Sequence, residues 1–185
     1  MLQLDLFGDI MSYFESDDLN IWVDTHFPLP QTLRNKLISK EEILLKLSQK
    51  ENPIELSTQK WVVIQEIVDF ITQKGSPIFY YKELYDYIGF ETCALCLVST
   101  EHYIKIHGSV KYAEDKCRVC PLAAIDRCTA EFSNFDRIIR ILYCGFSYLE
   151  NRHETMSDEE ISNNHYLLIE YIGKMIQNLE ILQSK

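Results

Sequence analysis

The sequence predicts a mainly α-helical protein with a small β-hairpin. Hydrophobic residues occupy 46% of its 185 positions, which is enough for a substantial core, whereas Gly and Pro are few. Apolar residues also recur at spacings of three and four along several long segments, as they do on the buried face of a helix. We expect an N-terminal segment over residues 1–30 and one helical domain over residues 31–185, with a cysteine-rich module at residues 93–128.

Three helical stretches are expected before the cysteine-rich module. Residues 31–51 contain the capping box Ser39–Glu42, which divides them into a short helix and a second helix that Asn52-Pro53 should end. Residues 57–74 carry a regular apolar stripe, and residues 80–88 are expected to form a shorter helix. Each boundary is marked by residues that cap or break helices.

Two further helical regions follow the module. Residues 121–150 keep the helical spacing of large apolar side chains, with Cys144-Gly145 as a point of close packing and Cys144 as a core residue rather than a ligand. A second capping box, Ser157–Glu160, begins a last helix that ends near Leu182. Its apolar side chains repeat in a heptad pattern, which serves either packing within the domain or a homodimer. The heptad seam consists of Ile161, His165, Leu168, Ile172, Met175, Leu179 and Leu182. His165 is expected to be a core histidine rather than a metal ligand.

Five of the six cysteines fall within the module. They are Cys93, Cys96, Cys117, Cys120 and Cys128. Two Cys-x-x-Cys pairs separated by residues 97–116 match the spacing of a four-cysteine metal site, because both thiolates of a pair can point the same way from one turn. Thiolates select zinc or iron–sulfur clusters over magnesium or calcium. The module is therefore predicted to hold a cysteine-ligated metal centre.

One assignment of the metal is Zn²⁺ bound by Cys93, Cys96, Cys117 and Cys120. Pro121 suits the first position of a helix, as in treble-clef zinc modules. Residues 103–113 are predicted to form a short β-hairpin between the two pairs, with His102 and His107 as further candidate ligands.

The other assignment is a [4Fe–4S] cluster. The run Cys117-Arg-Val-Cys120-Pro121-Leu122, followed by Cys128-Thr-Ala130, resembles the iron–sulfur loop of the endonuclease-III-type DNA glycosylases. The resemblance implies that Cys128 is also a ligand, although the interval from Cys120 to Cys128 is longer than in that family and the upstream cysteine is more distant. Zinc leaves the fifth cysteine unexplained, whereas a cluster accommodates it, so the cluster is the preferred assignment and Zn²⁺ the alternative.

The N-terminal residues Gln3, Leu4, Asp5, Leu6 and Phe7 resemble the pentapeptide Q-L-(S/D)-L-F, by which many replication and repair proteins dock on the bacterial DNA sliding clamp. The resemblance implies that Gln3 enters a polar subsite and that Leu6 and Phe7 fill an apolar pocket, as in other peptide recognition. The alternative is an N-terminal strand whose leucines face the core. Docking is preferred because such peptides sit on free tails.

Charge limits the choice of partner. The formal net charge is −10 and Lys and Arg form no run, so we expect no non-specific binding to nucleic acid. The helices before residue 99 and the predicted hairpin also follow the order of a winged helix-turn-helix. However, residues 91–99, where the recognition helix would lie, contain no Arg, Lys, Asn or Gln to read bases. A clamp, or another protein held on DNA, is the expected partner.

The leading hypothesis is an accessory or inhibitory protein of bacterial or phage DNA metabolism that carries a structural metal centre. The sequence has no phosphate-binding loop, dinucleotide fingerprint or hydrolase motif, so a non-enzymatic role is preferred. It also lacks a signal peptide and a membrane-spanning run, which predicts a cytoplasmic protein with reduced thiols. One alternative is a metal-containing winged-helix regulator that binds DNA. Another is an iron–sulfur DNA repair enzyme or nuclease.

Overall fold

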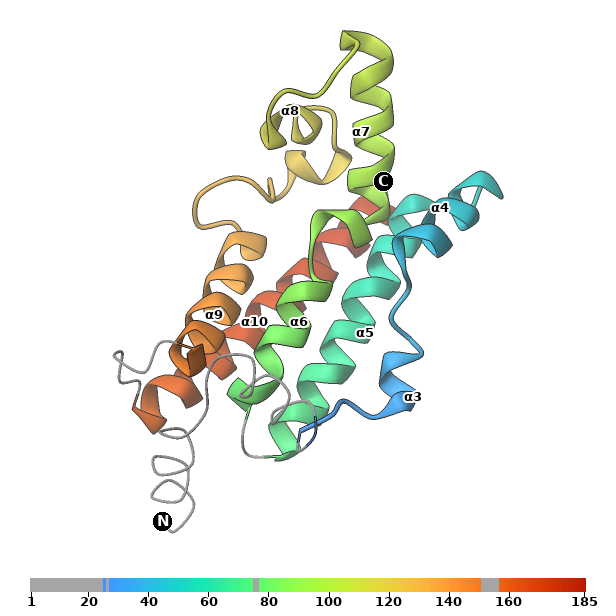
Figure 1. Ribbon diagram of the computed structural model, residues 1–185. Helices are drawn as coiled ribbons and strands as arrows, with labels where there is room; N and C mark the ends of the chain where they lie inside the picture. Colours follow the sequence, from blue (N-terminus) through green and yellow to red (C-terminus); the bar gives the residue numbers. More distant parts are fainter. Residues whose placement is uncertain (1–24, 26, 75–76, 151–156) are drawn as a thin grey trace.

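The computed structural model describes residues 25, 27–74, 77–150 and 157–185 (Figure 1). Over these ranges the chain forms α-helices and short 3₁₀ helices and no strand, so the prediction of a mainly helical protein is confirmed. The α-helices are α3 (Gln31–Arg34), α4 (Lys40–Ser48), α5 (Pro53–Lys74), α6 (Tyr81–Tyr87), α7 (Ala94–His107), α8 (Ala113–Cys117), α9 (Asn134–Glu150) and α10 (Asp158–Gln183). The 3₁₀ helices are η1 (Pro77–Tyr80), η2 (Phe90–Thr92) and η3 (Pro121–Ala124). None of the helices within this part of the chain is long and apolar enough to cross a lipid bilayer.

The core lies between α5, α6, α9 and α10 (Figure 1). Helices α5 and α10 run antiparallel, because Thr72 contacts His165 near one end while Glu55 and Gln183 are hydrogen-bonded near the other. The central residues of the heptad seam, from Leu168 to Leu179, are buried among side chains of the same chain. The seam therefore packs within the domain.

Helices α6 and α9 approach each other closely at Gly145, as expected for a point of close packing. A Cβ atom at this position would lie 2.2 Å from Cδ2 of Tyr81, whose side chain is buried. The neighbouring Cys144 is instead exposed, so it is not the core residue that the sequence predicted.

Both capping boxes are present, at the N-termini of α4 and α10. By contrast, Asn52-Pro53 begins α5 rather than merely ending α4. The side chain of Asn52 accepts a hydrogen bond from the backbone N–H of Ile54, and a proline is tolerated in the first turn because its missing N–H has no partner there. The helix expected over residues 57–74 is therefore one turn longer.

The predicted β-hairpin over residues 103–113 is wrong. Helix α7 continues to His107, Gly108 ends it with a φ of 83°, and α8 follows. The alternation of apolar and polar residues is too short to distinguish a strand from a helix. Contacts one turn apart favour the helix here: Lys105 pairs with Glu101, and the rings of Tyr103 and His107 lie 4.4 Å apart.

His165 is a hydrogen-bonded core residue, as predicted. The hydroxyl of Thr72 donates to the carbonyl of Val68, so it accepts from Nε2–H of His165 at 2.7 Å. Nδ1 then accepts from the hydroxyl of Tyr81 at 3.1 Å. Both ring nitrogens are satisfied by the neutral imidazole, and burial lowers the pKa of His165 below its ordinary value of 6.5.

The close approach at Gly145 predicts that Gly145→Ala destabilises the fold by about 1–3 kcal/mol, because the buried ring of Tyr81 cannot move aside freely. Gly173→Ala is the matched control, since a Cβ there meets nothing within 4 Å inside α10. The control should stabilise the protein by about 0.5–1 kcal/mol. Chemical denaturation measures both, and equal effects would contradict the packing at Gly145.

The lowered pKa of His165 predicts that the protein becomes less stable as the pH is lowered. Below pH 6.5 the unfolded chain binds a proton at this position before the folded chain does, so stability is lost as the pH falls toward the lowered pKa. Thermal melting should show this loss in the wild type and less of it in His165→Gln. The exposed His102→Gln should melt as the wild type does at each pH, and a His165→Gln profile parallel to the wild type would refute the assignment.

Candidate metal centre

The fold brings all five cysteines of the predicted module to one region, at the base of α7. Cys93 is the N-cap of α7, and Cys96 lies in its first turn. Cys117 ends α8, Cys120 is the N-cap of η3, and Cys128 lies in the loop before α9. Pro121 occupies the first position of η3, as predicted. All six cysteines lie in the described part of the chain, and none of them is in a disulfide bond.

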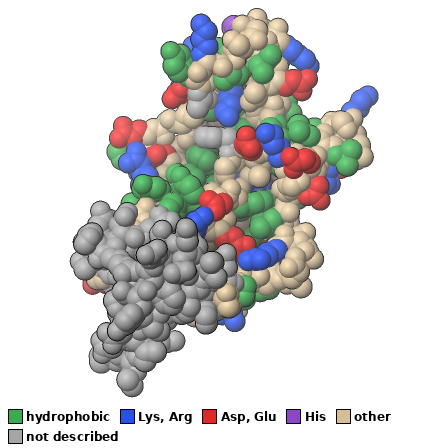
Figure 2. Space-filling model, viewed as in Figure 1, with side chains coloured by type: hydrophobic (Ala, Val, Ile, Leu, Met, Phe, Trp, Pro, Cys, Tyr) green, Lys and Arg blue, Asp and Glu red, His purple; other side chains and the backbone are tan. Residues whose placement is uncertain are grey.

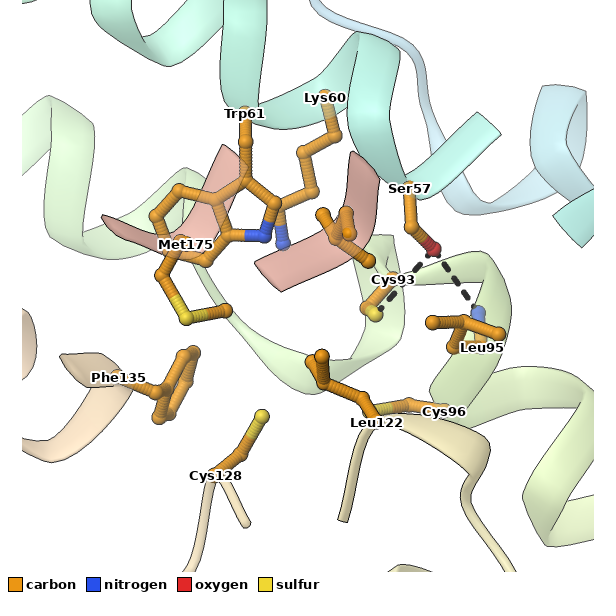
Figure 3. Close-up of a pocket in the computed structure, with 11 residues that line it drawn as sticks. Ser57, Lys60, Trp61, Cys93, Leu95, Cys96, Leu122, Cys128, Phe135 and Met175 are labelled. Carbon is orange, nitrogen blue, oxygen red and sulfur yellow. Dashed lines mark hydrogen bonds between the residues drawn. The ribbon is translucent and has the colours of Figure 1, made fainter. Parts of the chain in front are cut away.

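A small cavity lies between these elements and α5 (Figure 3). Cys93, Cys96 and Cys128 line it, whereas Cys117 and Cys120 do not. Figure 3 shows Cys93 and Cys128 entering the space from different elements. The rest of the lining comes from Ser57, Lys60, Trp61, Leu95, Leu122, Phe135, Met175 and Leu179. The cavity thus combines three thiols and one cation with a mainly apolar wall.

The thiols are near one another but do not form a finished coordination site. Within the described part of the chain, no three Cys, His, Asp or Glu side chains could hold a metal ion as they stand. Binding by the two Cys-x-x-Cys pairs would require their side chains to turn toward a common point. His102 and His107, the other candidate ligands, are exposed on the outer part of α7.

Cys93 is the cysteine best placed to ionise. The hydroxyl of Ser57 accepts a hydrogen bond from the backbone N–H of Leu95, which leaves its own proton to donate to Sγ of Cys93 at 3.7 Å. A hydrogen bond from the Cys96 thiol, with further help from the Lys60 ammonium and the Ser57 hydroxyl, lowers the pKa of Cys93 to about 5 despite its burial. Cys93 would therefore bind a metal as a thiolate near neutral pH.

The other thiols hold their protons more tightly. The hydrogen bond to Cys93, followed by burial, raises the pKa of Cys96. Burial raises the pKa of Cys120 and of Cys128, and the charges of neighbouring cysteines add to both shifts. Cys117 is one of these neighbours. Each of the five cysteines thus lies within electrostatic range of at least two others, and together they cannot all ionise without a cation among them.

Lys60 is a residue of the site that the sequence prediction missed. Its side chain is 2% exposed, and its Nζ donates to the carbonyl oxygens of Ile88 at 3.1 Å and Gly89 at 3.0 Å and to the hydroxyl of Thr92 at 2.9 Å. Ser57 and Lys60 fall on the buried stripe of α5 at helical spacing from Ile64. That spacing was the available signal, although lysines on helices are usually exposed.

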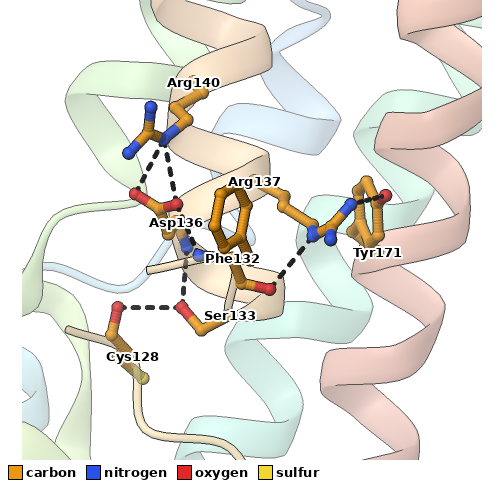
Figure 4. A network of polar contacts seen from close by, with 7 residues as sticks. All are labelled: Cys128, Phe132, Ser133, Asp136, Arg137, Arg140 and Tyr171. Carbon is orange, nitrogen blue, oxygen red and sulfur yellow. Dashed lines mark hydrogen bonds and ion pairs between the residues drawn. The ribbon is translucent and has the colours of Figure 1, made fainter. Parts of the chain in front are cut away.

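The loop that carries Cys128 is fixed to α9 and α10 (Figure 4). Ser133 donates to the carbonyl of Cys128 at 3.1 Å and accepts the backbone N–H of Asp136 in the first turn of α9. Arg137 donates to the carbonyl of Phe132 at 3.0 Å and to the hydroxyl of Tyr171 on α10 at 2.6 Å. The backbone beside Cys128 is therefore held from two helices.

Thr129, which follows Cys128, has a buried hydroxyl with no hydrogen-bond partner among the described residues. Buried polar groups are nearly always paired. Thr129 does not line the cavity, so this hydroxyl does not bear on the metal. The donor set of the five grouped cysteines is the feature that fits a thiolate-bound metal.

Comparison of the chain with protein-family models, with curated proteins and with solved structures found no match.

Proposed function

We propose that this chain is an accessory protein that docks on the DNA sliding clamp through residues 3–7 and whose helical body is stabilised by a cysteine-ligated metal centre. The buried ammonium of Lys60 beside the cysteines is the observation that carries the metal centre. The match of residues 3–7 to the clamp-docking pentapeptide is the observation that supports the sliding clamp as the partner. These residues, and most of the N-terminal segment 1–30, lie outside the described part of the chain.

The hydrogen bonds of Lys60 identify its charged form. Thr92 donates its hydroxyl proton to a backbone carbonyl, so it accepts from Lys60, as do the carbonyls of Ile88 and Gly89. Three acceptors require three protons on Nζ, and only the ammonium carries three. Burial lowers the pKa of Lys60, and the charges of Cys93, Cys96 and Cys128 oppose that shift.

A buried ammonium needs a negative partner. Lys60 makes no ion pair with Asp or Glu within the residues that the structure describes, and the charges acting on it come from cysteines. Thiolates packed together would repel one another unless a cation binds them. A metal bound by thiolates would relieve their mutual repulsion, because it neutralises most of their negative charge. The remaining net negative charge of the metal centre would be the partner of the Lys60 ammonium.

The lining of the cavity favours the iron–sulfur assignment over zinc. Cys128 lines the same cavity as Cys93 and Cys96, and its backbone is anchored by Ser133. A zinc ion held only by the two Cys-x-x-Cys pairs would leave this half-buried thiol without a role. A [4Fe–4S] cluster bound through Cys128 would cross-link α7, the α8–η3 segment and the loop before α9, which is a structural role.

The clamp-docking proposal agrees with the charge of the chain. A net charge of −10 opposes direct contact with the phosphate backbone, whereas a clamp already encircles DNA and can be reached by a peptide. On the face seen in Figure 2, Lys and Arg side chains are interspersed with Asp and Glu. Residues 103–107, which a winged-helix regulator would need in its wing, are helical. The alternative of a DNA-binding regulator is therefore less favoured.

The metal centre predicts that Cys117→Ser or Cys120→Ser loses bound metal and lowers the melting temperature, because formation of the site is coupled to folding. Elemental analysis and visible spectra of protein purified without oxygen, with melting curves, measure both effects. Exposed Cys144→Ser is the matched control and should retain metal and stability. Full metal content and unchanged melting in both ligand variants would refute the centre.

The Cys128→Ser variant distinguishes a zinc site from an iron–sulfur cluster. A zinc ion on the two Cys-x-x-Cys pairs tolerates this change, so the protein should keep its zinc and remain colourless. A cluster that uses Cys128 should lose iron and its brown colour. Iron content equal to that of the wild type in Cys128→Ser would rule out Cys128 as a ligand.

The docking proposal predicts that Leu6→Ala with Phe7→Ala abolishes binding to a purified bacterial sliding clamp. The two anchors supply most of the apolar burial of the peptide, about 1.5–3 kcal/mol each. The melting temperature should stay nearly unchanged, because anchors on a docking tail do not belong to the core. Calorimetric titration of clamp with both proteins tests the proposal. It fails if the wild type does not bind, or if the double variant loses stability instead.

A further inference from the structure

We propose that Lys60 is the positioning residue of the metal centre and that its positive charge sets the affinity of the centre for its metal. This role rests on the metal centre proposed above. It concerns a side chain on α5, which contributes no cysteine ligand but forms a wall of the cavity (Figure 3).

Nζ of Lys60 carries the positive charge and also helps to place Cys93, the first cysteine ligand in the sequence. Nζ of Lys60 binds the carbonyl oxygens of Ile88 and Gly89, where α6 ends, and the hydroxyl of Thr92 in η2. A cation is favourable at the C-terminus of a helix, where carbonyl groups lack backbone partners. Cys93 follows Thr92 directly, so the ammonium fixes the turn that delivers this cysteine.

Ser57 assists from the preceding turn of α5. Its hydroxyl contacts Sγ of Cys93 and accepts the N–H of Leu95, so it holds both the thiol and the start of α7. Ser57 is 1% exposed, and Lys60 is similarly buried, so neither interaction is weakened by water. Helix α5 therefore supplies an outer shell that orients Cys93 and compensates its charge.

The charge has a predictable effect on metal binding. A centre with four thiolates remains negative with either zinc or an iron–sulfur cluster, so a buried ammonium beside it stabilises the metal-bound state. Without the metal, four thiolates would repel one another and would not be held together beside this ammonium, so the metal-free protein gains less from its charge. Removing the charge should therefore weaken metal binding more than it destabilises the metal-free fold.

The test uses the full chain loaded with Zn²⁺, because thiolate ligands select this ion as well as iron–sulfur clusters. Competition with a chelator measures affinity, and melting curves with and without Zn²⁺ measure stability. Lys60→Gln removes the charge but keeps hydrogen-bond donors. Thr92→Val removes one acceptor from the same network and keeps the charge. Lys174→Gln, on the exposed face of α10, controls for loss of a lysine elsewhere.

We expect Lys60→Gln to lower the affinity for Zn²⁺ by about 10–100-fold, with the loss of melting temperature concentrated in the zinc-loaded form. Thr92→Val should melt at a lower temperature in both forms and lose less affinity than Lys60→Gln, because it disturbs the turn before Cys93 but keeps the charge. Lys174→Gln should change neither. Wild-type affinity in Lys60→Gln, or an equal loss of affinity in Thr92→Val, would overturn the role of the charge while leaving the metal centre intact.

Other outcomes also have a definite meaning. If Lys60→Gln does not fold even with Zn²⁺, Lys60→Arg takes its place and must retain the affinity of the wild type, because it keeps the charge; loss of affinity there overturns the role. A wild-type protein that takes up neither Zn²⁺ nor iron overturns the metal centre itself, and the role of Lys60 with it. If the wild type takes up iron alone, Lys60→Gln must retain less iron than the wild type, and equal iron content overturns the role.

Discussion

The structure around the cysteines depends on one buried charge, the ammonium of Lys60. It joins α5 to the end of α6 and to η2 through three hydrogen bonds, and so it sets where α7 begins. Leaving such a charge without its partners costs several kcal/mol, of the order of the whole stability of many domains. The arrangement of α5, α6 and α7 is therefore tightly constrained at the point where Cys93 enters the site.

The rest of the site is organised by hydrogen bonds between backbone and side chains. Ser57 holds the first turn of α7, while Ser133 ties the loop of Cys128 to α9. Arg137 then connects that loop to α10. These bonds help to bring cysteines from three separate segments to one region, beside the core residues Leu95 and Leu122.

The outer part of α7 has a different character from the four-helix core. Ile104 and Ile106 are 43% and 57% exposed, so the outer part of α7 gains little stability from buried apolar side chains. Small units with poor cores commonly rely on metals or disulfides for stability. A metal centre at the base of α7 would provide that stability where hydrophobic packing does not, which agrees with the structural role proposed for it.

The sequence by itself determined the features that depend on neighbouring residues. The capping boxes at Ser39 and Ser157, the long apolar faces of α5 and α10, and the start of η3 at Pro121 were all predictable, because each follows from side chains within a turn or two of the chain. The grouping of the five cysteines was also predictable, because the spacing of Cys-x-x-Cys pairs reflects the local geometry of a metal ligand pair.

Only the tertiary structure decided what depends on distant contacts. Residues 103–107 could have formed a strand or a helix; they form the end of α7, where Ile104 and Ile106 are exposed and no strand from the described part of the chain lies beside them. In the sequence, nothing distinguishes Lys60 from the exposed lysines that are common on helices. Its burial follows from the carbonyl groups of α6, which lie about 30 residues away along the chain and satisfy an ammonium that water would otherwise have to solvate.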